Sequence, residues 1–232
     1  MVLRYGRDMI ETYATSAELA AAAAAAATGA LEAALDERGA ASLVGTGGRS
    51  PAPVYDLLAQ AKLDWRRIAV TLSDDRFVPV DSPDSNERLL RERLLTGPAA
   101  AARFVPISTA ADSVEAAAEK VEADVRAMAP YDVMLLGMGE DGHVASLIPG
   151  SPVLDLGMDP HGTRFCLGIP AGVGSPPVAR VTMTMPALLQ ARLILVLISG
   201  AKKRDIVEKG NGLPVHALLR QAQAPVRVLW NP

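Results

Sequence analysis

Residues Tyr131–Gly150 read YDVMLLGMGEDGHVASLIPG, and the expected fold is built outward from this stretch. Its first part, Tyr131–Leu136, is an apolar run that ends at a turn signal, which is the pattern of a buried strand. The turn that follows, Gly137–His143, holds three glycines, two carboxylates and one of the three histidines of the chain. Ligands of α/β proteins bind at the carboxyl ends of strands, so this turn indicates a site.

The histidine and one aspartate of this turn are the candidate catalytic residues. His143 can act as a general base near neutral pH, and Asp141 can orient it or raise its basicity. A surface or capping histidine is the alternative. Neither His161 nor His216 has metal-ligand spacing with His143, so no metal site is expected. The sequence also lacks the Gly-x-Ser-x-Gly elbow of a serine hydrolase.

Strand and helix signals alternate on both sides of this stretch. The alternation predicts an α/β fold with a mainly parallel sheet, helices on both faces and a single domain over residues 1–232. The part after residue 150 is β-rich, as an appended lobe or an antiparallel edge. Apolar runs predict the strands at residues 41–45, 67–72, 104–107, 131–136, 163–169, 180–185, 192–199 and 226–230.

The N-terminal part combines two local patterns. The first fourteen residues alternate loosely between apolar and polar, which predicts an edge hairpin. Thr15 and Glu18 then form a capping-box pattern, so a helix is expected to begin there. It runs through the alanines Ala20–Ala27 to Leu35 and is broken only at Gly29. Alanine is the best helix former, and a face of small residues packs closely against a sheet.

Composition excludes several classes of function. The 232 residues are 50% hydrophobic and carry a net charge of −3, with no basic stripe, so neither nucleic-acid nor membrane binding is expected. The single cysteine, Cys166, lies in an apolar stretch and is expected to be a buried, inert thiol in a reducing compartment. We see no signal peptide and no apolar segment of the ~18 residues that would suggest a membrane span. A cytoplasmic protein is therefore expected.

A second strand end leads into Gly47-Gly48-Arg49-Ser50, directly before a predicted helix. Ser50 is the expected N-cap and Pro51 the first helical residue. Glycines allow close approach of the backbone to a ligand, and free N–H groups at a helix start attract an anion. A tight strand-to-helix turn without a ligand is the alternative. The motif matches neither the Walker nor the dinucleotide pattern, which disfavours nucleotide binding.

Two further strand ends carry charged residues. Ser73-Asp74-Asp75-Arg76, followed by Ser85-Asn86, places an arginine beside carboxylates. Arg76 is either part of a surface ion pair or a bidentate fork for a phosphate or carboxylate. Lys202-Lys203-Arg204 follow the most apolar strand, and three cations at a helix start oppose the helix dipole. An anionic ligand would offset that cost, and a solvated basic face is the alternative.

Taken together, these motifs resemble those of the 6-phosphogluconolactonase family over nearly the whole chain. The family signature Gly-Gly-x-[Ser/Thr]-Pro is similar to Gly47–Pro51, and Asp-Glu-Arg-x-Val-Pro…Ser-Asn is similar to Asp74–Asn86. The family motif Gly-Met-Gly-x-Asp-Gly-His-Thr-Ala-Ser-Leu-Phe-Pro-Gly is similar to Gly137–Gly150. A late Arg-x-Thr…Gly-x-x-Lys element appears as Arg180, Thr182, Gly200 and Lys203.

Three positions depart from the family pattern. Asp75 replaces a glutamate, which leaves the bracing of Arg76 open, and Ile148 replaces a phenylalanine. Val144 replaces a threonine beside His143, so no hydrogen bond of that threonine carries over.

The resemblance implies a Rossmann-like fold shared with glucosamine-6-phosphate deaminases and ribose-5-phosphate isomerases. It also implies hydrolysis of 6-phospho-D-glucono-1,5-lactone to 6-phosphogluconate without metal or cofactor. His143 would be the base, with Asp141 contributing, and Arg76 and Lys203 would be the phosphate ligands. Backbone N–H groups of Gly47–Gly48 or of Gly139–Gly142 would stabilise the oxyanion. The substrate-binding residues implied are Gly47, Gly48, Arg49, Ser50, Asp74, Arg76, Ser85, Asn86, Gly139, Arg180 and Lys203.

Two alternatives share the expected fold. A glucosamine-6-phosphate deaminase typically continues from the loop histidine as Ile-Ala-Phe-Asn, whereas Val144–Leu147 here reads Val-Ala-Ser-Leu. A sugar-phosphate sensor of the repressor type would carry an N-terminal helix-turn-helix, and no such basic segment precedes the alanine helix. A small-molecule substrate and a monomer or weak homodimer are expected.

Overall fold

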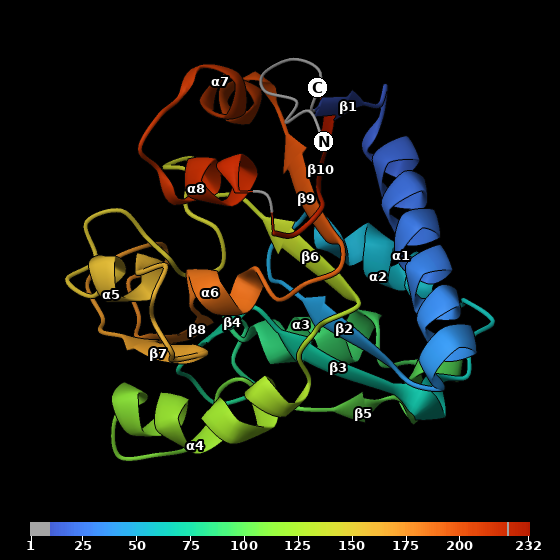
Figure 1. Ribbon diagram of the computed structural model, residues 1–232, viewed down its shortest axis with the longest axis horizontal. Coiled ribbons are helices and arrows are strands. Elements are labelled where there is room, and N and C mark those ends of the chain that lie inside the picture. The colour runs from blue at the N-terminus through green and yellow to red at the C-terminus, as the bar shows by residue number, and fades with distance from the viewer. Residues whose placement is uncertain (1–9, 222) are drawn as a thin grey trace.

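The computed structural model describes residues 10–221 and 223–232, which form two β-sheets with surrounding helices (Figure 1). The larger sheet has the strand order β1-β10-β9-β6-β2-β3-β5, and all neighbouring strands in it are parallel. The mainly parallel α/β fold expected from the sequence is confirmed. The strands of this sheet are β1 (Ile10–Thr12), β2 (Ala41–Gly45), β3 (Ile68–Leu72), β5 (Arg103–Phe104), β6 (Val133–Gly137), β9 (Ile194–Ser199) and β10 (Val226–Asn231).

The order of the strands reverses between β2 and β6. From β2 the chain moves outward through β3 to β5, and it then returns to place β6 on the other side of β2, followed by β9 and β10. This point is the topological switch point of the sheet, where ligands of open α/β sheets bind. The central strands are buried on both faces, which explains why each reads as a continuous apolar run in the sequence.

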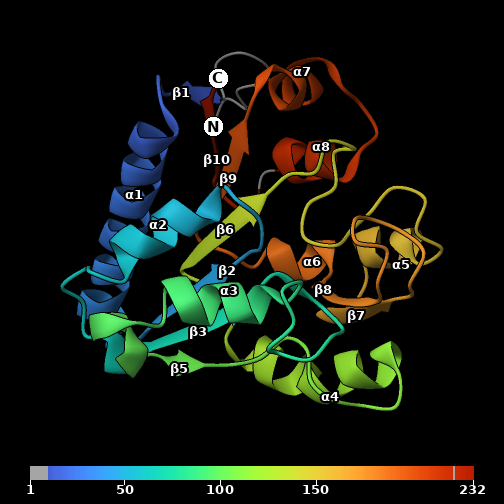
Figure 2. The ribbon, with the colours of Figure 1, turned by 180° about the vertical axis from the view of Figure 1, so that it is seen from behind.

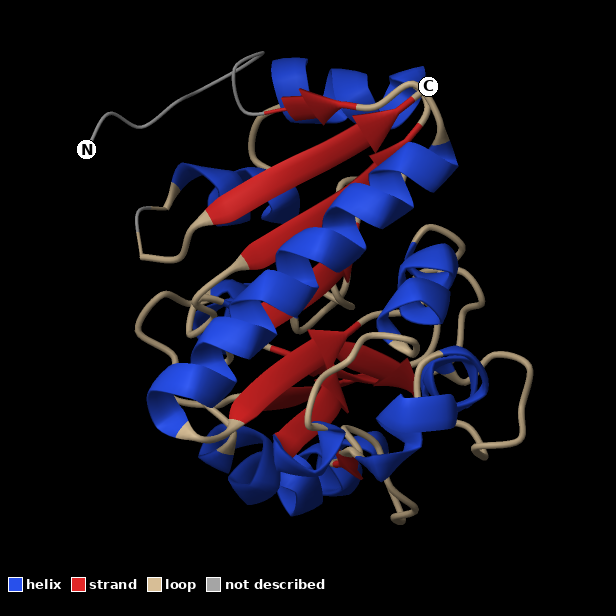
Figure 3. Cartoon of the chain, turned by 90° about the vertical axis from the view of Figure 1, so that its right-hand side faces the viewer, coloured by secondary structure: helices blue, strands red, loops and turns tan. Residues whose placement is uncertain are grey.

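Helices lie on both sides of the larger sheet. Helices α1 and α2 are on one side, and α6 and α8 are on the other, together with the smaller sheet (Figures 1 and 2). Helix α1 crosses the strands diagonally (Figure 3). The helix bounds are α1 (Ser16–Arg38), α2 (Pro51–Leu58), α3 (Asn86–Arg93), α4 (Val114–Ala127), α5 (Leu154–Met158), α6 (Met185–Leu188), α7 (Ala201–Lys209) and α8 (Pro214–Arg220).

Helix α1 is continuous, so the expected break at Gly29 is wrong. The Thr15 hydroxyl caps its start by accepting the N–H of Glu18, and Gly39 ends it in the left-handed conformation, with a φ of 74°. Its buried face is formed mainly by alanines that pack against the sheet. The helix has a mean hydropathy of 1.3 over 18 residues, so by length and composition alone it is able to cross a membrane, contrary to expectation. Its packing as a core helix explains the same apolarity.

The smaller sheet is antiparallel, in the order β4-β8-β7, with β4 (Asp74–Arg76), β7 (Cys166–Ile169) and β8 (Arg180–Met183). The stretch Asp74–Arg76 was expected to be a loop, but it pairs with β8 and forms an edge strand. A strand from the first half of the chain therefore completes the β-rich part after residue 150. That part is thereby tied to the larger sheet through the short link from β3 to β4.

At the N-terminus, the expected hairpin does not form among the described residues. Ile10–Thr12 instead pairs in parallel with β10 at the edge of the larger sheet. Val2, Leu3, Tyr5 and Met9, on which the hairpin prediction also relied, lie outside the described residues. Cys166 is buried as expected, and burial raises the pKa of its thiol.

Candidate active site

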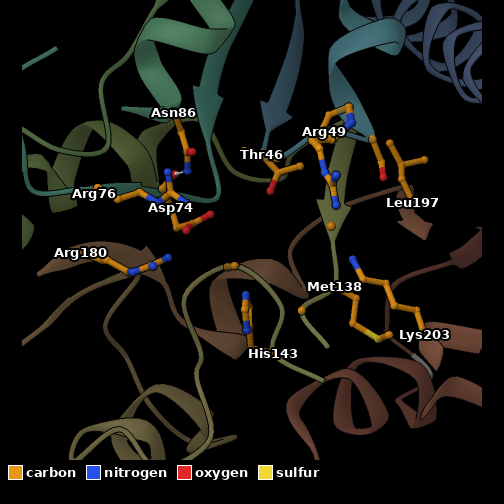
Figure 4. Close-up of a pocket in the computed structure, with 17 residues that line it drawn as sticks. Thr46, Arg49, Asp74, Arg76, Asn86, Met138, His143, Arg180, Leu197 and Lys203 are labelled. Carbon is orange, nitrogen blue, oxygen red and sulfur yellow. Dashed lines mark hydrogen bonds between the residues drawn. The ribbon is translucent and has the colours of Figure 1, made fainter. Parts of the chain in front are cut away.

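A cleft opens at the switch point, above the carboxyl ends of β2, β3, β6 and β9 (Figure 4). Its empty space, including the part open to solvent at the mouth, is about 610 Å³. Most of the predicted site residues line this cleft, although they come from segments far apart in the sequence. They are Gly47, Gly48, Arg49, Ser50, Asp74, Arg76, Asn86, Gly139, His143, Arg180 and Lys203.

His143 and Asp141 form a hydrogen-bonded pair. Asp141 Oδ1 lies 2.6 Å from His143 Nδ1, and it also accepts the backbone N–H of His143 at 3.2 Å. The hydrogen bond from His143 lowers the pKa of Asp141 to about 2, so this carboxylate is ionised at neutral pH. An ionised carboxylate accepts the proton on Nδ1, which leaves the lone pair of the neutral imidazole on Nε2. The ring points into the cleft (Figure 4).

The backbone around this pair is shaped by the residues that make the turn. A Cβ at Gly139 would collide with both the His143 ring and the Asp141 carboxylate, so only glycine allows the pair to pack there. The N–H of Gly139 donates to the His143 carbonyl at 3.0 Å, and the N–H of Gly142 donates to the Gly139 carbonyl at 3.1 Å. Ala145, which also lines the cleft, has a φ of 50°, a strained conformation for a residue with a side chain.

The loop after β2 is held by contacts at both of its ends. Tyr55 of α2 binds the loop at Thr46, where its hydroxyl accepts the N–H at 2.7 Å and donates to the carbonyl at 2.6 Å. A Cβ at Gly47 would collide with the Asn86 carboxamide. Ser50 occupies the predicted N-cap position and Pro51 is the first helical residue, as expected. Ser50 has helical backbone angles, however, and its side chain makes no capping hydrogen bond, so its hydroxyl is left for other partners.

The start of α2 offers fewer donors than a typical helix start. Pro51 and Pro53 occupy its first turn, and proline has no backbone N–H. An anion at this place would therefore rely on the loop Gly47–Ser50 and on nearby side chains rather than on the helix itself. We call this region, with Gly47, Gly48, Arg49, Ser50 and Lys203, the glycine-loop end of the cleft.

Of the two adjacent lysines, only Lys203 faces the cleft. Lys202 is exposed and forms an ion pair with Glu140 at 2.7 Å. Lys203 lines the cleft near Arg49, and burial lowers the pKa of its ammonium, with Arg49 acting in the same direction. In the described part of the chain, Arg49 has no ion pair. The Arg49 and Lys203 side chains converge on one side of His143 in Figure 4.

Arg76 and Arg180 lie on the other side of His143 (Figure 4), and we call this region the arginine-pair end. They are directly opposite each other in the β4–β8 register, where like charges destabilise a sheet. Arg180 is only 3% exposed, and burial lowers the pKa of its guanidinium. Each arginine donates to one carbonyl, of Asp84 at 2.6 Å and of Pro176 at 2.8 Å. The Nε of each is buried without a partner among the described residues.

Asp75 organises the loop behind this end. Its carboxylate accepts the backbone N–H groups of Arg76, Asn86 and Glu87 at 2.6 to 2.9 Å. Burial raises the pKa of Asp75 to about 6. Asp75 therefore braces the backbone of Arg76 and not its guanidinium. Ser85 also lies outside the cleft lining, since its hydroxyl caps α3 and faces Asp75.

A buried network beneath the cleft was missed by the sequence reasoning. The Ser146 hydroxyl donates to Asp74 Oδ2 at 2.6 Å, and Arg180 Nη1 lies 3.5 Å from the same hydroxyl. The Ser73 hydroxyl donates to the other Asp74 oxygen at 3.0 Å. Ser146 thus joins the histidine loop to β4 and β8. Its only sequence signal was its place in the Gly137–Gly150 motif.

Other cleft residues were not predicted as site residues at all. Met138 and Leu197 supply apolar walls, and such residues cannot be told from core residues by sequence pattern alone. Within residues 10–221 and 223–232, no cluster of three or more His, Cys, Asp or Glu side chains is arranged to hold a metal ion.

Comparison with known proteins agrees with the motifs. Residues 14–230 match the family model described as glucosamine-6-phosphate isomerases/6-phosphogluconolactonase. A 6-phosphogluconolactonase of Caulobacter vibrioides is 42% identical over 223 residues, covering 95% of this chain and 96% of the relative. One from Pseudomonas aeruginosa is 43% identical over 230 residues, covering 96% and 94%.

The fold gives the same result. The crystal structure of a 6-phosphogluconolactonase from Shewanella baltica superposes with a TM-score of 0.91 at 31% identity, over 100% of both chains. The match of sequence and fold extends over both sheets and the cleft, and the chain belongs to the family of glucosamine-6-phosphate isomerases and 6-phosphogluconolactonases.

Proposed function

We propose that this protein is a 6-phosphogluconolactonase, which hydrolyses 6-phospho-D-glucono-1,5-lactone to 6-phosphogluconate in the oxidative pentose phosphate pathway. The observation that carries the proposal is the His143–Asp141 pair, whose imidazole lines a cleft with cations on both sides of it. A general base flanked by positive charge suits attack of water on an anionic lactone. Family membership and the Val-Ala-Ser-Leu sequence after His143 favour this substrate over glucosamine 6-phosphate.

In the proposed reaction, His143 moves the proton in both steps. Its Nε2 takes a proton from water as the water oxygen attacks C1 of the lactone, and it returns that proton to the ring oxygen as the C1–O bond breaks. Asp141 stays ionised, holds the Nδ1 proton and stabilises the imidazolium between the two steps. A lactone is an activated ester. Proton transfer by His143 and stabilisation of the negative charge that develops on the C1 oxygen are therefore sufficient for its hydrolysis.

We assign the substrate phosphate to the glycine-loop end. Arg49 and Lys203 supply positive charge there, and the Ser50 hydroxyl is free of a capping bond. Glycine at positions 47 and 48 lets backbone N–H groups approach the phosphate oxygens. This keeps the predicted role of Lys203 and separates it from Arg76, which lies on the opposite side of His143 (Figure 4).

We assign the charge that develops on the C1 oxygen to the arginine-pair end. The backbone donors of Gly139 and Gly142 are used inside their own turn, so they are poor candidates for an oxyanion site. Arg76 and Arg180 are fixed by β4 and β8 and face each other as like charges. An anionic oxygen between them relieves their repulsion, and fixed cations at the place where charge develops lower the barrier.

The proposal is tested with freshly generated 6-phosphogluconolactone, measured against its spontaneous hydrolysis. We expect a large acceleration with the phosphorylated lactone and no ammonia release from glucosamine 6-phosphate in a parallel assay. A rate no faster than the spontaneous one would contradict the proposal. Release of ammonia would identify a deaminase instead.

A further inference from the structure

His216 is a buried histidine that lies outside the cleft and takes no part in the reaction proposed above. It is 3% exposed and sits in the first turn of α8. Its Nδ1 accepts the backbone N–H of Leu213 at 3.1 Å, and its Nε2 lies 2.8 Å from the carbonyl oxygen of Ile206. A carbonyl only accepts and an N–H only donates, so these contacts fit the neutral ring with its proton on Nε2.

One of these two bonds holds the helix that carries Lys203. No residue of helix α7 is fully buried, and the helix packs on the core through the partly buried Ile206 and Val207. Its start is tied down where the Trp230 indole donates to the Gly200 carbonyl at 2.9 Å. Ile206 lies one turn beyond Lys203, and its carbonyl is the acceptor for His216. The His216 bond therefore fixes α7 on the side of Lys203 away from Gly200.

The other bond supports the histidine loop. Leu213 is the N-cap of α8, and His216 accepts its N–H from the position that Glu or Gln holds in a capping box. The Leu213 side chain lies directly against Gly142, where an added Cβ would be 2.6 Å from Leu213 Cδ1. The N–H of Val215 also donates to the Gly142 carbonyl at 3.1 Å. Gly142 is the residue directly before His143.

We propose that His216 is a positioning residue that sets the placement of Lys203 through α7 and of His143 through Leu213 and Gly142. The assignment of kinetic roles rests on the function proposed above, with Lys203 as a phosphate ligand and His143 as the base. One ring nitrogen acts toward Lys203 and the other acts toward His143. The two effects are therefore separable by replacing one nitrogen at a time.

Two amide variants each replace the function of one ring nitrogen and remove that of the other. Asn in His216→Asn keeps an acceptor near the Nδ1 position and loses the bond to Ile206. Gln in His216→Gln keeps a donor near the Nε2 position and loses the bond to Leu213. We expect His216→Asn mainly to raise KM for the phosphorylated lactone, and His216→Gln mainly to lower kcat, each by about 10-fold, because small misplacements near a reacting group are costly.

Hydrogen exchange gives a readout that does not depend on activity. We expect faster amide exchange over residues 201–209 in His216→Asn, and over residues 139–147 in His216→Gln. Exposed His161 supplies the matched control, since His161→Asn and His161→Gln should change neither region. Val125→Ala, on the buried face of α4, controls for lost stability alone.

The outcomes separate this inference from the proposed function. If both His216 variants lower only the melting temperature, as Val125→Ala does, with kcat, KM and both exchange regions as in the wild type, His216 has no positioning role. If the wild type does not hydrolyse the lactone but the exchange pattern appears as expected, the coupling stands and the proposed function fails. If both variants disturb both regions equally, the division between the two nitrogens is wrong.

Discussion

The two ends of the cleft are both cationic, but they are built differently. At the glycine-loop end, Arg49 and Lys203 project from segments that follow parallel strands, and Lys203 belongs to a helix without buried residues. At the arginine-pair end, Arg76 and Arg180 are paired in register across an antiparallel sheet, and Arg180 is buried. Adaptable cations suit the binding of a phosphate, which is charged before and after reaction. Fixed, desolvated cations suit charge that exists only in the transition state.

The largest effect is expected where the two ends meet, at His143. His143→Ala should lower kcat by about 10²–10⁴-fold, the usual contribution of an acid–base group, with folding intact. Circular dichroism and a melting curve check folding, and the lactone assay checks turnover. Near-normal turnover in this variant would show that His143 is not the general base.

Asp141→Asn should also reduce turnover, by about 10²-fold, because an amide does not fix the Nδ1 proton or stabilise the imidazolium. In the wild type, the pKa of Asp141 is about 2, so its carboxylate stays ionised at any pH at which the fold is assayed. Asp141 should therefore make no contribution to the acid limb of the kcat profile. Titration of the Asp141 carboxylate within the assayed pH range, followed by NMR, would contradict this pairing.

A smaller loss of kcat is expected when a contact that positions the arginine pair is removed. Ser146→Ala removes the hydroxyl that joins Asp74 to the histidine loop and to Arg180. It leaves one acceptor, Asp74 Oδ2, and one donor, Arg180 Nη1, without this partner in a buried place, so kcat should fall by about 10-fold while KM changes little. Ser85→Ala is the matched control, since its hydroxyl caps α3 outside the cleft lining. Equal losses in both variants would assign Ser146 a purely structural role.

The smallest effect concerns stability at the arginine-pair end. Burial raises the pKa of Asp75 to about 6 from its ordinary value of 3.8, so the folded state holds a proton that the unfolded state releases between those values. This group therefore makes the protein less stable as pH rises from about 4 to 6. Asp75→Asn should flatten that part of the melting-temperature profile, although it also removes an acceptor of backbone N–H groups. If the melting temperature of Asp75→Asn depends on pH in this range as it does in the wild type, the raised pKa of Asp75 is contradicted.

The two ends of the cleft also differ in how far they could be predicted from the sequence. The glycine-loop end follows from local signals: a buried strand, two glycines and a helix beginning with proline. The arginine-pair end depends on the pairing of β4 with β8, residues more than a hundred positions apart. A three-residue strand of charged side chains has no periodicity to reveal it, so Asp74–Arg76 read as a loop. The bond from Ser146 to Asp74 was hidden for the same reason.

The family motifs identified several site residues whose role could not be decided from local sequence patterns. Arg180 was named from its motif alone, and the sequence contained no sign that it would face Arg76. The choice between Lys202 and Lys203 needed the direction of α7, which sends Lys202 to Glu140 and Lys203 to the cleft. The start of α2 was predicted correctly, but the Ser50 side chain makes no capping hydrogen bond, because the residue already has helical backbone angles.

The most direct test of the central claim compares Lys203→Ala with Arg76→Ala on two substrates, 6-phosphogluconolactone and the unphosphorylated gluconolactone. Lys203→Ala should raise KM for the phosphorylated lactone by about 10²-fold and leave the unphosphorylated one nearly unchanged, since a lost charge-assisted phosphate contact costs about 1.5–3 kcal/mol. Arg76→Ala should lower kcat for both lactones by similar factors. If Arg76→Ala instead affects only the phosphorylated lactone, or Lys203→Ala slows both equally, the assignment of the two ends is contradicted.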